Sequence, residues 1–127
     1  MAAFTHVAVG TNDLNEARAF YDSVLAPLGL KRLKDLGDRG SCWGHSTEEF
    51  IVLTPADGKP ACPANGGTVS FEAPSRAAVA AFHKAALAAG GKDEGAVGPR
   101  GFWLDAYAGY VRDLDGNKLA AYCRKAE

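Results

Sequence analysis

The sequence predicts an α+β fold in which two βαβββ modules pair to form a cup-shaped mixed sheet around a cleft. The first reason is an internal repeat, because residues 5–29 align without a gap on residues 67–91. The second reason is that strand, turn, helix and closing glycine recur in the same order in both copies. The identities are Val7/Val69, Ala19/Ala81, Phe20/Phe82, Leu25/Leu87, Ala26/Ala88 and Gly29/Gly91.

Each repeat opens with a short strand, at residues 4–9 and 68–72, followed by an amphipathic helix. In the first helix Asp13 is the expected N-cap, and Glu16 three residues later completes a capping box. Ser75 is the expected N-cap of the second helix. Gly29 and the Gly90-Gly91 pair are placed to end the two helices in the left-handed conformation.

Short strand-like segments separated by turn residues follow each helix. They are expected at residues 31–36, 40–45, 49–54, 103–106, 107–113 and 118–123. Residues 95–101, GAVGPRG, are expected to form a loop because they combine glycine and proline. The whole chain, 1–127, is expected to be a single domain. Module one spans about 1–55, the linker about 56–66 and module two about 67–127.

The composition is that of an ordinary globular domain, with 47% hydrophobic and 23% charged residues and a net charge of −1. This balance argues against a nucleic-acid partner, which would favour a basic face. No apolar run has the length of a membrane span, and no signal peptide is expected at the N-terminus. Three cysteines without CxxC spacing predict reduced thiols, and hence a cytoplasmic protein.

Two longer sequence segments and a histidine on the first strand occur together with the duplicated βαβββ arrangement. These are ARAFYDSVLAPLGLK at residues 17–31, YVRDLDGNKLAAYC at residues 110–123, and His6. Together they resemble the vicinal oxygen chelate superfamily, which includes glyoxalases, fosfomycin- and bleomycin-resistance proteins, extradiol dioxygenases and methylmalonyl-CoA epimerases. The resemblance covers essentially the whole chain. It implies the paired-module fold and, for a small single-chain member, a homodimer.

The resemblance also implies where a divalent metal would bind in the metal-dependent members. Their ligands come from the first and last strand of each module, as a His or Gln and a Glu. Only His6 matches this pattern. The other three positions fall on Thr68, near Val52 and on Ala120. A single imidazole does not hold such an ion, so no metal and no cofactor are expected. Shifting the alignment would bring in Glu49 or Glu72 as alternative ligands.

Seven residues are candidates for a site in the cleft. His6 is the candidate catalytic residue, because an imidazole titrates near neutral pH, and its alternative role is that of a half-buried structural histidine. Aromatic side chains are candidates for pocket walls, although aromatics equally build cores. Arg100 offers a cation to a carboxylate or phosphate, or remains a solvated loop charge. The candidates for substrate binding are Trp43, His45, Arg100, Trp103, Tyr107 and Tyr110.

Two functions follow from the sequence. The first is a glyoxalase/bleomycin-resistance-like protein that binds a small organic ligand in its cleft, with the usual metal-ligand set largely lost. The second is a lyase, isomerase or dioxygenase-like enzyme of the same superfamily. Such an enzyme would be metal-dependent through other ligands, or metal-free through His6 and a tyrosine. The sequence leaves open whether the protein is an enzyme.

Overall fold

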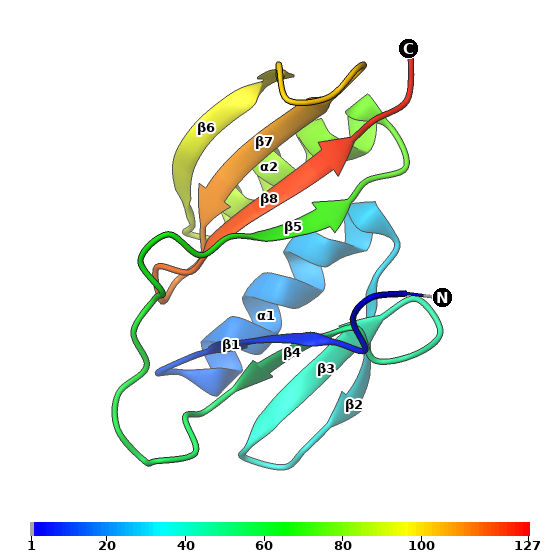
Figure 1. Cartoon of the computed structure of the whole chain (residues 1–127). Coiled ribbons are helices and arrows are strands. Elements are labelled where there is room, and N and C mark those ends of the chain that lie inside the picture. The colour runs from blue at the N-terminus through cyan, green and yellow to red at the C-terminus, as the bar shows by residue number, and fades with distance from the viewer. Residues whose placement is uncertain (1) are drawn as a thin grey trace.

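The computed structural model describes residues 2–127 and contains two successive βαβββ modules (Figure 1). The elements of the first module are β1 (Val7–Gly10), α1 (Leu14–Leu25), the short 3-10 helix η1 (Ala26–Leu28), β2 (Lys31–Asp35), β3 (Gly40–Gly44) and β4 (Phe50–Leu53). The elements of the second module are β5 (Val69–Glu72), α2 (Arg76–Ala88), β6 (Lys92–Pro99), β7 (Tyr107–Arg112) and β8 (Lys118–Cys123). The predicted α+β fold class is confirmed.

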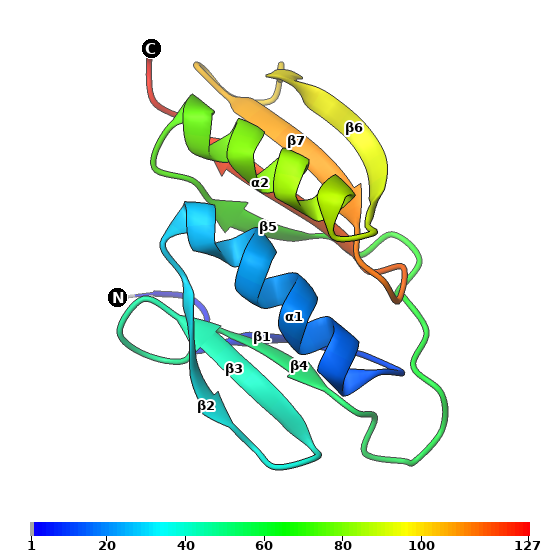
Figure 2. The same cartoon turned by 180° about the vertical axis from the view of Figure 1, so that it is seen from behind.

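Each module forms a four-stranded mixed sheet, with the orders β1-β4-β3-β2 and β5-β8-β7-β6. The first strand of each module pairs in parallel with the last, and the remaining pairs are antiparallel. Helices α1 and α2 pack against each other on one side of both sheets, as the view from behind shows (Figure 2). In the described part of the chain, no helix lies on the opposite side of the sheets (Figure 1). This helix-free side is called the open side below.

A continuous group of aromatic rings fills the space between the helices and the sheets. Tyr21 on α1 contacts Trp43 and Phe50 at centroid distances of 5.6 and 4.9 Å. Phe50 on β4 then contacts Phe71 on β5 at 5.1 Å, in an edge-to-face geometry. Aromatic pairs of this kind are favourable beyond the area that they bury. The core therefore runs from one module into the other.

The repeat found in the sequence describes equivalent places in the two modules. Phe20 and Phe82 are both buried, one on each helix. The predicted N-caps are confirmed, because Asp13 accepts a hydrogen bond from the Glu16 N–H and Ser75 accepts one from the Ala78 N–H. The capping box is only half formed, because the Asp13 N–H donates to the Thr11 hydroxyl. Gly29, at φ 84°, ends the first helical segment in the left-handed region, where a glycine is least strained.

The turn DLDGN between β7 and β8 is fastened to the first module by a buried carboxylate. Asp113 is 6% exposed and accepts hydrogen bonds from the Tyr21 hydroxyl on α1 and from the Asn117 backbone and side-chain amides. The side chain of Asn117 also donates to the carbonyl of Gly10, at the end of β1. The neighbouring Asp115 accepts from the backbone N–H of Asn12. The turn therefore joins the modules, which explains its many polar residues.

Two strand boundaries differ from the sequence-based expectation. Residues 95–99, expected in a loop, belong to strand β6, and residues 103–106, expected as a strand, form the following loop. β6 lies at the edge of its sheet and its pairing with β7 shifts register twice, and such a strand tolerates glycine and proline. In addition, β1 starts at Val7, so His6 lies just before the strand.

Two further features concern the environment of the protein. Within residues 2–127, none of the helices combines the length and the apolar character that crossing a membrane requires. All three cysteines are free, and Cys42 and Cys123 are buried whereas Cys62 is exposed.

Candidate functional site

The strands of the second sheet alternate between the core and the open side. On β8, the side chains of Leu119, Ala121 and Cys123 belong to the hydrophobic core. Lys118 and Tyr122 alternate with them and line a pocket on the other face. Ala120 lies between these two on the same face, paired in the register with Ser70 on one side and Tyr110 on the other.

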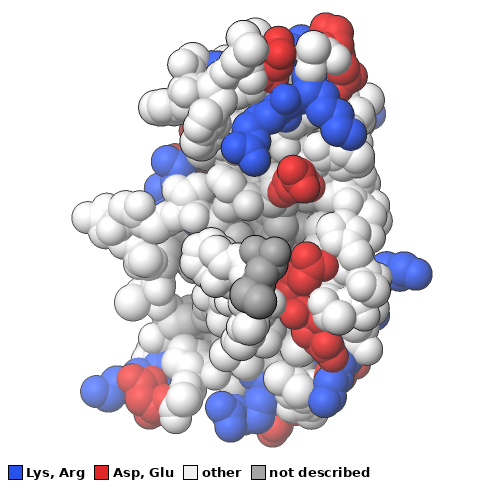
Figure 3. Space-filling view, turned by 45° about the vertical axis from the view of Figure 1, so that its right-hand side comes forward, with Lys and Arg blue, Asp and Glu red and all other residues white. Residues whose placement is uncertain are grey.

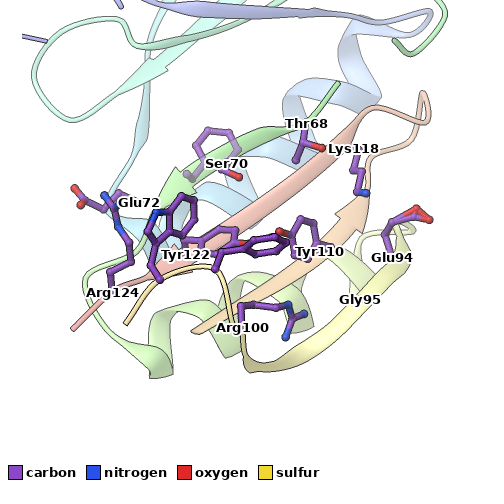
Figure 4. A pocket seen from close by; sticks show the side chains of 13 residues that line it. Thr68, Ser70, Glu72, Glu94, Gly95, Arg100, Tyr110, Lys118, Tyr122 and Arg124 are labelled. Carbon is purple, nitrogen blue, oxygen red and sulfur yellow. The ribbon is translucent and has the colours of Figure 1, made fainter. Parts of the chain in front are cut away.

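A pocket of about 750 Å³ lies on this face of the second sheet (Figure 4). Its floor comes from β5, β7 and β8, and its side comes from β6 and the loop after it. The lining residues are Thr68, Ser70, Phe71, Glu72, Glu94, Gly95, Arg100, Phe102, Trp103, Tyr110, Lys118, Tyr122 and Arg124. A volume of this size suits a small organic molecule.

Four aromatic rings form a continuous row along the pocket. Phe102 contacts Trp103 at a centroid distance of 6.2 Å, and Trp103 meets Tyr122 edge-to-face at 5.7 Å. Tyr122 meets Tyr110 at 5.9 Å, and the two hydroxyl groups are hydrogen-bonded to each other. Phe102 and Trp103 are 77% and 54% exposed, unlike the aromatic rings of the core. The row is therefore separate from the core and presents ring faces and edges to the pocket.

The loop between β6 and β7 carries two of these rings. The N–H of Arg100 donates to the carbonyl of Ala106 at 2.8 Å, and the N–H of Ala106 donates to the carbonyl of Trp103 at 3.2 Å. Asp105 has φ 60°, a left-handed conformation that Asp tolerates better than most residues. The loop is thus closed at its base, with Trp103 held near Tyr122.

Cationic side chains outnumber acidic ones around the pocket. Arg100, Lys118 and Arg124 line it together with Glu72 and Glu94. Within residues 2–127 none of these three cations has a carboxylate within ion-pair distance. A space-filling view shows a group of Lys and Arg side chains in the upper half of the molecule, which the second module forms, and further charged side chains of both signs along the upper and lower edges (Figure 3).

Arg100 is held differently from the free guanidinium that the sequence suggested. One terminal nitrogen donates to the carbonyls of Gly98 and Pro99, and the other donates to the carbonyl of Ala96. The guanidinium also lies 5.4 Å from the centroid of the Tyr110 ring. Arg100 therefore shapes the end of β6 and adds positive charge to the pocket. Most of its donor fork is already used.

His6 lies in a separate, smaller hollow of about 310 Å³ on the open side, at the junction of the two modules. His45, Glu49 and Glu72 line the same hollow. His45 contacts Glu49 through its Nδ1 at 3.0 Å and donates to it through its backbone N–H at 2.9 Å. The backbone N–H, followed by the ring contact, lowers the pKa of Glu49. The hollow shares Ser70, Phe71 and Glu72 with the larger pocket.

Three of the predicted substrate-binding residues lie outside this pocket, and one of them, His45, lines the smaller hollow. Trp43 is completely buried, and its indole N–H donates to Asp22 at 3.0 Å, so Trp43 belongs to the core. Tyr107 packs against the core and against the guanidinium of Arg76, whose central carbon is 5.0 Å from the ring centroid. The expectation that these two aromatics line the cleft is therefore corrected. Arg100, Trp103 and Tyr110 do line the pocket, and a role for them in binding stays a prediction.

Tyr122, Lys118 and the β5 side chains of the pocket were not among the residues predicted from the sequence. The sequence contains a signal for Lys118 and Tyr122, because the family resemblance places Ala120 on the cleft side of its strand. Residues two positions away on the same strand share its face. Strand alternation from Ala120 therefore points directly to Lys118 and Tyr122.

The positions of the family's metal ligands can be tested on this geometry. Thr68 and Ala120 face the pocket side, where neither supplies a strong ligand. Val52 packs in the core, so its assignment as a cleft position is corrected. Glu49, on the opposite face of this segment, lines the hollow with His6. In the described part of the chain, no three His, Cys, Asp or Glu side chains are close enough together to bind one metal ion. The residues present do not fit the family's metal centre.

The fold and the open-side pocket define a protein of the glyoxalase-like class. The model of the Glyoxalase/Bleomycin resistance protein/Dioxygenase superfamily matches residues 3–121, and the chain belongs to this superfamily. No match was found among curated proteins.

Several solved structures share the fold. A glyoxalase/bleomycin resistance protein from Albidiferax ferrireducens T118 is 37% identical, with 98% of this chain and 100% of that chain covered and a TM-score of 0.88. A lactoylglutathione lyase from Agrobacterium tumefaciens is 23% identical, with 97% of this chain and 94% of that chain covered and a TM-score of 0.68. A fosfomycin resistance protein from Listeria monocytogenes is 14% identical, with 98% of this chain and 95% of that chain covered and a TM-score of 0.69. The last two similarities concern the fold alone.

Proposed function

We propose that this protein binds a small, planar organic ligand in the pocket of the second sheet, without a metal centre. The observation that carries the proposal is the row of four aromatic rings from Phe102 to Tyr110 along a pocket of about 750 Å³. Exposed aromatic rings in a concave site favour flat, apolar ligands, because they offer a large contact area at a small cost in side-chain entropy. The 37% identical relative named as a glyoxalase/bleomycin resistance protein is consistent with a binding role.

The proposed independence from metal rests on the donor set. A divalent cation needs several oxygen, nitrogen or sulfur ligands to replace its hydration shell. In this chain the positions expected to supply them carry Thr68, Val52 and Ala120 beside His6. The carboxylate nearest in sequence to Val52, Glu49, is engaged by His45. The proposed binding function therefore involves no metal ion.

Tryptophan fluorescence tests the ligand site, because the two tryptophans lie in different environments. Trp103 lines the pocket, whereas Trp43 is buried in the core. We expect planar aromatic compounds to quench the emission of the Trp43→Phe variant, in which only Trp103 emits. The same compounds leave the emission of the Trp103→Phe variant unchanged. Quenching in the second variant, or in neither, contradicts the proposed site.

Metal analysis of protein purified without chelators or a nickel column tests the second half of the proposal. We expect less than about 0.1 equivalents of zinc, iron, manganese or nickel. One equivalent of any of these metals, lost in a His6→Ala variant, overturns the metal-free assignment and supports a metal-dependent enzyme.

A second candidate function is a metal-free lyase or isomerase, and one observation favours it. Glu72 lines both the pocket and the hollow that holds His6, so acidic and imidazole groups border the space of a bound ligand. Such groups can transfer protons between carbon and oxygen atoms. Incubating bound ligands with the protein and following them by NMR tests this function. Chemical change that disappears in His6→Ala supports it, whereas unchanged ligand supports binding alone.

For the quaternary structure we propose a homodimer. Three large apolar side chains, those of Phe4, Phe102 and Leu104, are 75%, 77% and 88% exposed, and a second copy would shield such side chains from water. Light scattering during gel filtration measures the mass directly. A mass of one chain at all concentrations contradicts the proposal.

We also propose that the protein resides in the cytoplasm. The exposed Cys62 is free, and free exposed thiols persist in reducing compartments. Rapid alkylation of Cys62 in intact cells by a membrane-permeant reagent, without prior reduction, is expected. Labelling by an impermeant reagent contradicts a cytoplasmic location.

A further inference from the structure

We propose that the ligands of this pocket are planar aromatic carboxylates, whose carboxylate group is bound by the paired hydroxyls of Tyr110 and Tyr122 together with the Lys118 ammonium. This inference rests on the proposed binding function and adds the chemical class of the ligand. It follows from the number of O–H donors in the tyrosine pair and from the charges around the pair.

The two tyrosines come from neighbouring antiparallel strands and share one face. Tyr110 is on β7 and pairs with Ala120, and Tyr122 is two residues further along β8 on the same side. Their rings are nearly perpendicular, at 88°, and their hydroxyl groups are hydrogen-bonded to each other. Figure 4 shows the two side chains next to each other on the floor of the pocket, with Lys118 at one end and Arg124 and Glu72 at the other.

The hydroxyl pair has one hydrogen-bond donor more than it uses. Each phenol has one O–H, and the bond between Tyr110 and Tyr122 consumes only one of the two. Within residues 2–127, neither hydroxyl donates to any further acceptor. The second O–H is therefore available to an acceptor atom of a ligand in the pocket.

Tyr110 keeps its proton at neutral pH. Burial, the hydrogen bond with Tyr122 and the electrostatic interaction with Tyr122 raise the pKa of Tyr110 to about 12, against a smaller lowering by Arg100. A neutral hydroxyl donates to an anionic oxygen and does not repel it. Hydrogen bonds from neutral donors to charged acceptors are stronger than those between neutral groups.

The charges around the pair favour an anion. The Lys118 nitrogen lies 5.3 Å from the centroid of the Tyr110 ring, and no carboxylate in the described chain pairs with it. Glu94, the acidic residue that lines the pocket near Gly95, is paired with Arg112 at 2.8 Å, which offsets its charge. Arg100 adds a further positive charge beside Tyr110. A carboxylate bound here therefore meets a positive potential and a free O–H donor.

The rest of the pocket accounts for the aromatic part of the ligand and for its single charge. Trp103 and Phe102 extend the row of rings away from the tyrosine pair. Arg124 lies over the Trp103 ring, with its guanidinium carbon 5.4 Å from the centroid. Glu72 lines the pocket without a cationic partner in residues 2–127, which disfavours a second carboxylate at that end. The ligand that satisfies all these groups is a flat monocarboxylate.

Calorimetric titration with three naphthalene derivatives tests the inference. The probes are 2-naphthoate, 2-naphthalenemethanol and 2-naphthylmethylamine, which share a ring system and differ in charge. We expect naphthoate to bind at least about tenfold more tightly than the alcohol, and the amine more weakly than both. The affinity for naphthoate falls with rising salt concentration.

Two variants and two matched controls locate the effect. Tyr122→Phe and Lys118→Met each weaken naphthoate binding by about tenfold, and change the affinity for the alcohol by less than about threefold. Tyr107→Phe and Lys84→Met change neither, because these side chains lie outside the pocket. Retained binding of the alcohol shows that the variants are folded.

The outcomes separate the two proposals. Binding of none of the three compounds overturns the proposed function itself. Equal binding of all three, or naphthoate binding that survives both Tyr122→Phe and Lys118→Met, leaves an aromatic-binding pocket and overturns the carboxylate inference. Preference for the amine also overturns it.

Discussion

Replacing Asp113 by alanine removes the carboxylate that fastens the β7–β8 turn to helix α1. Its partners include the Tyr21 hydroxyl and the backbone N–H of Asn117, at residues that are 1% and 8% exposed, so water does not readily replace the lost acceptor. Each buried donor left without a partner costs about 1–3 kcal/mol, which gives about 2–6 kcal/mol for two donors. The side-chain amide of Asn117 keeps its bond to Gly10 and adds little. We expect a loss of about 3–5 kcal/mol, out of a total stability of about 5–15 kcal/mol.

Equilibrium urea unfolding, followed by circular dichroism, measures this loss. Asp57→Ala is the matched control, because Asp57 is exposed and, among residues 2–127, its carboxylate accepts a bond only from the nearby Lys59 N–H. We therefore expect a loss of less than about 0.5 kcal/mol. Tyr21→Phe removes one donor and is expected to cost about 1–2 kcal/mol. A loss below about 1 kcal/mol for Asp113→Ala would refute the idea that this carboxylate joins the modules.

Two further predictions concern the backbone and the pocket. Gly44→Ala places a Cβ atom 1.8 Å from the carbonyl oxygen of Thr47, so we expect it to lower the free energy of unfolding by more than about 2 kcal/mol. Gly101→Ala is the control, because open space surrounds Gly101, and we expect it to change the free energy of thermal unfolding by less than about 0.5 kcal/mol. Similar unfolding of the two variants would contradict this placement. Because burial raises the pKa of Tyr110 to about 12, the unfolded chain loses the Tyr110 proton at a lower pH than the folded chain. The stability that the protonated Tyr110 contributes is therefore complete below about pH 10 and is lost as the pH rises towards 12. Tyr110→Phe should therefore flatten the decline in urea midpoint above pH 10, whereas a decline as steep as that of the control Tyr107→Phe would contradict it.

The parts of the fold that were predicted from the sequence depend on local chemistry. The cap residues Asp13 and Ser75 act on N–H groups three residues away, so their spacing in the chain is enough to identify them. The left-handed Gly29 at the end of η1 is local in the same sense. The repeat was detectable because equivalent positions, such as Phe20 and Phe82, meet the same packing demand in both modules.

The candidate site was predicted less well, because its members depend on which face of a strand points to the helices. Trp43 and Trp103 look alike in the sequence, yet one is in the core and the other lines the pocket. Tyr107 and Tyr110 are three residues apart on β7, so strand alternation places them on opposite faces. That inference was available from the spacing alone. The inclusion of Tyr122 needed the pairing of β7 with β8.

The sequence by itself determined the two βαβββ modules and the helix caps, since these depend on propensities and on contacts between residues close in the chain. The sequence also determined that the positions where the family resemblance implies glutamates carry Ala120 and, nearby, Val52. Only the tertiary structure decided that Tyr110, Tyr122, Trp103 and Lys118 share one pocket, and that Asp113 links the modules. Those groupings depend on strand register and on the packing of one module against the other, which bring together side chains that are distant in the chain.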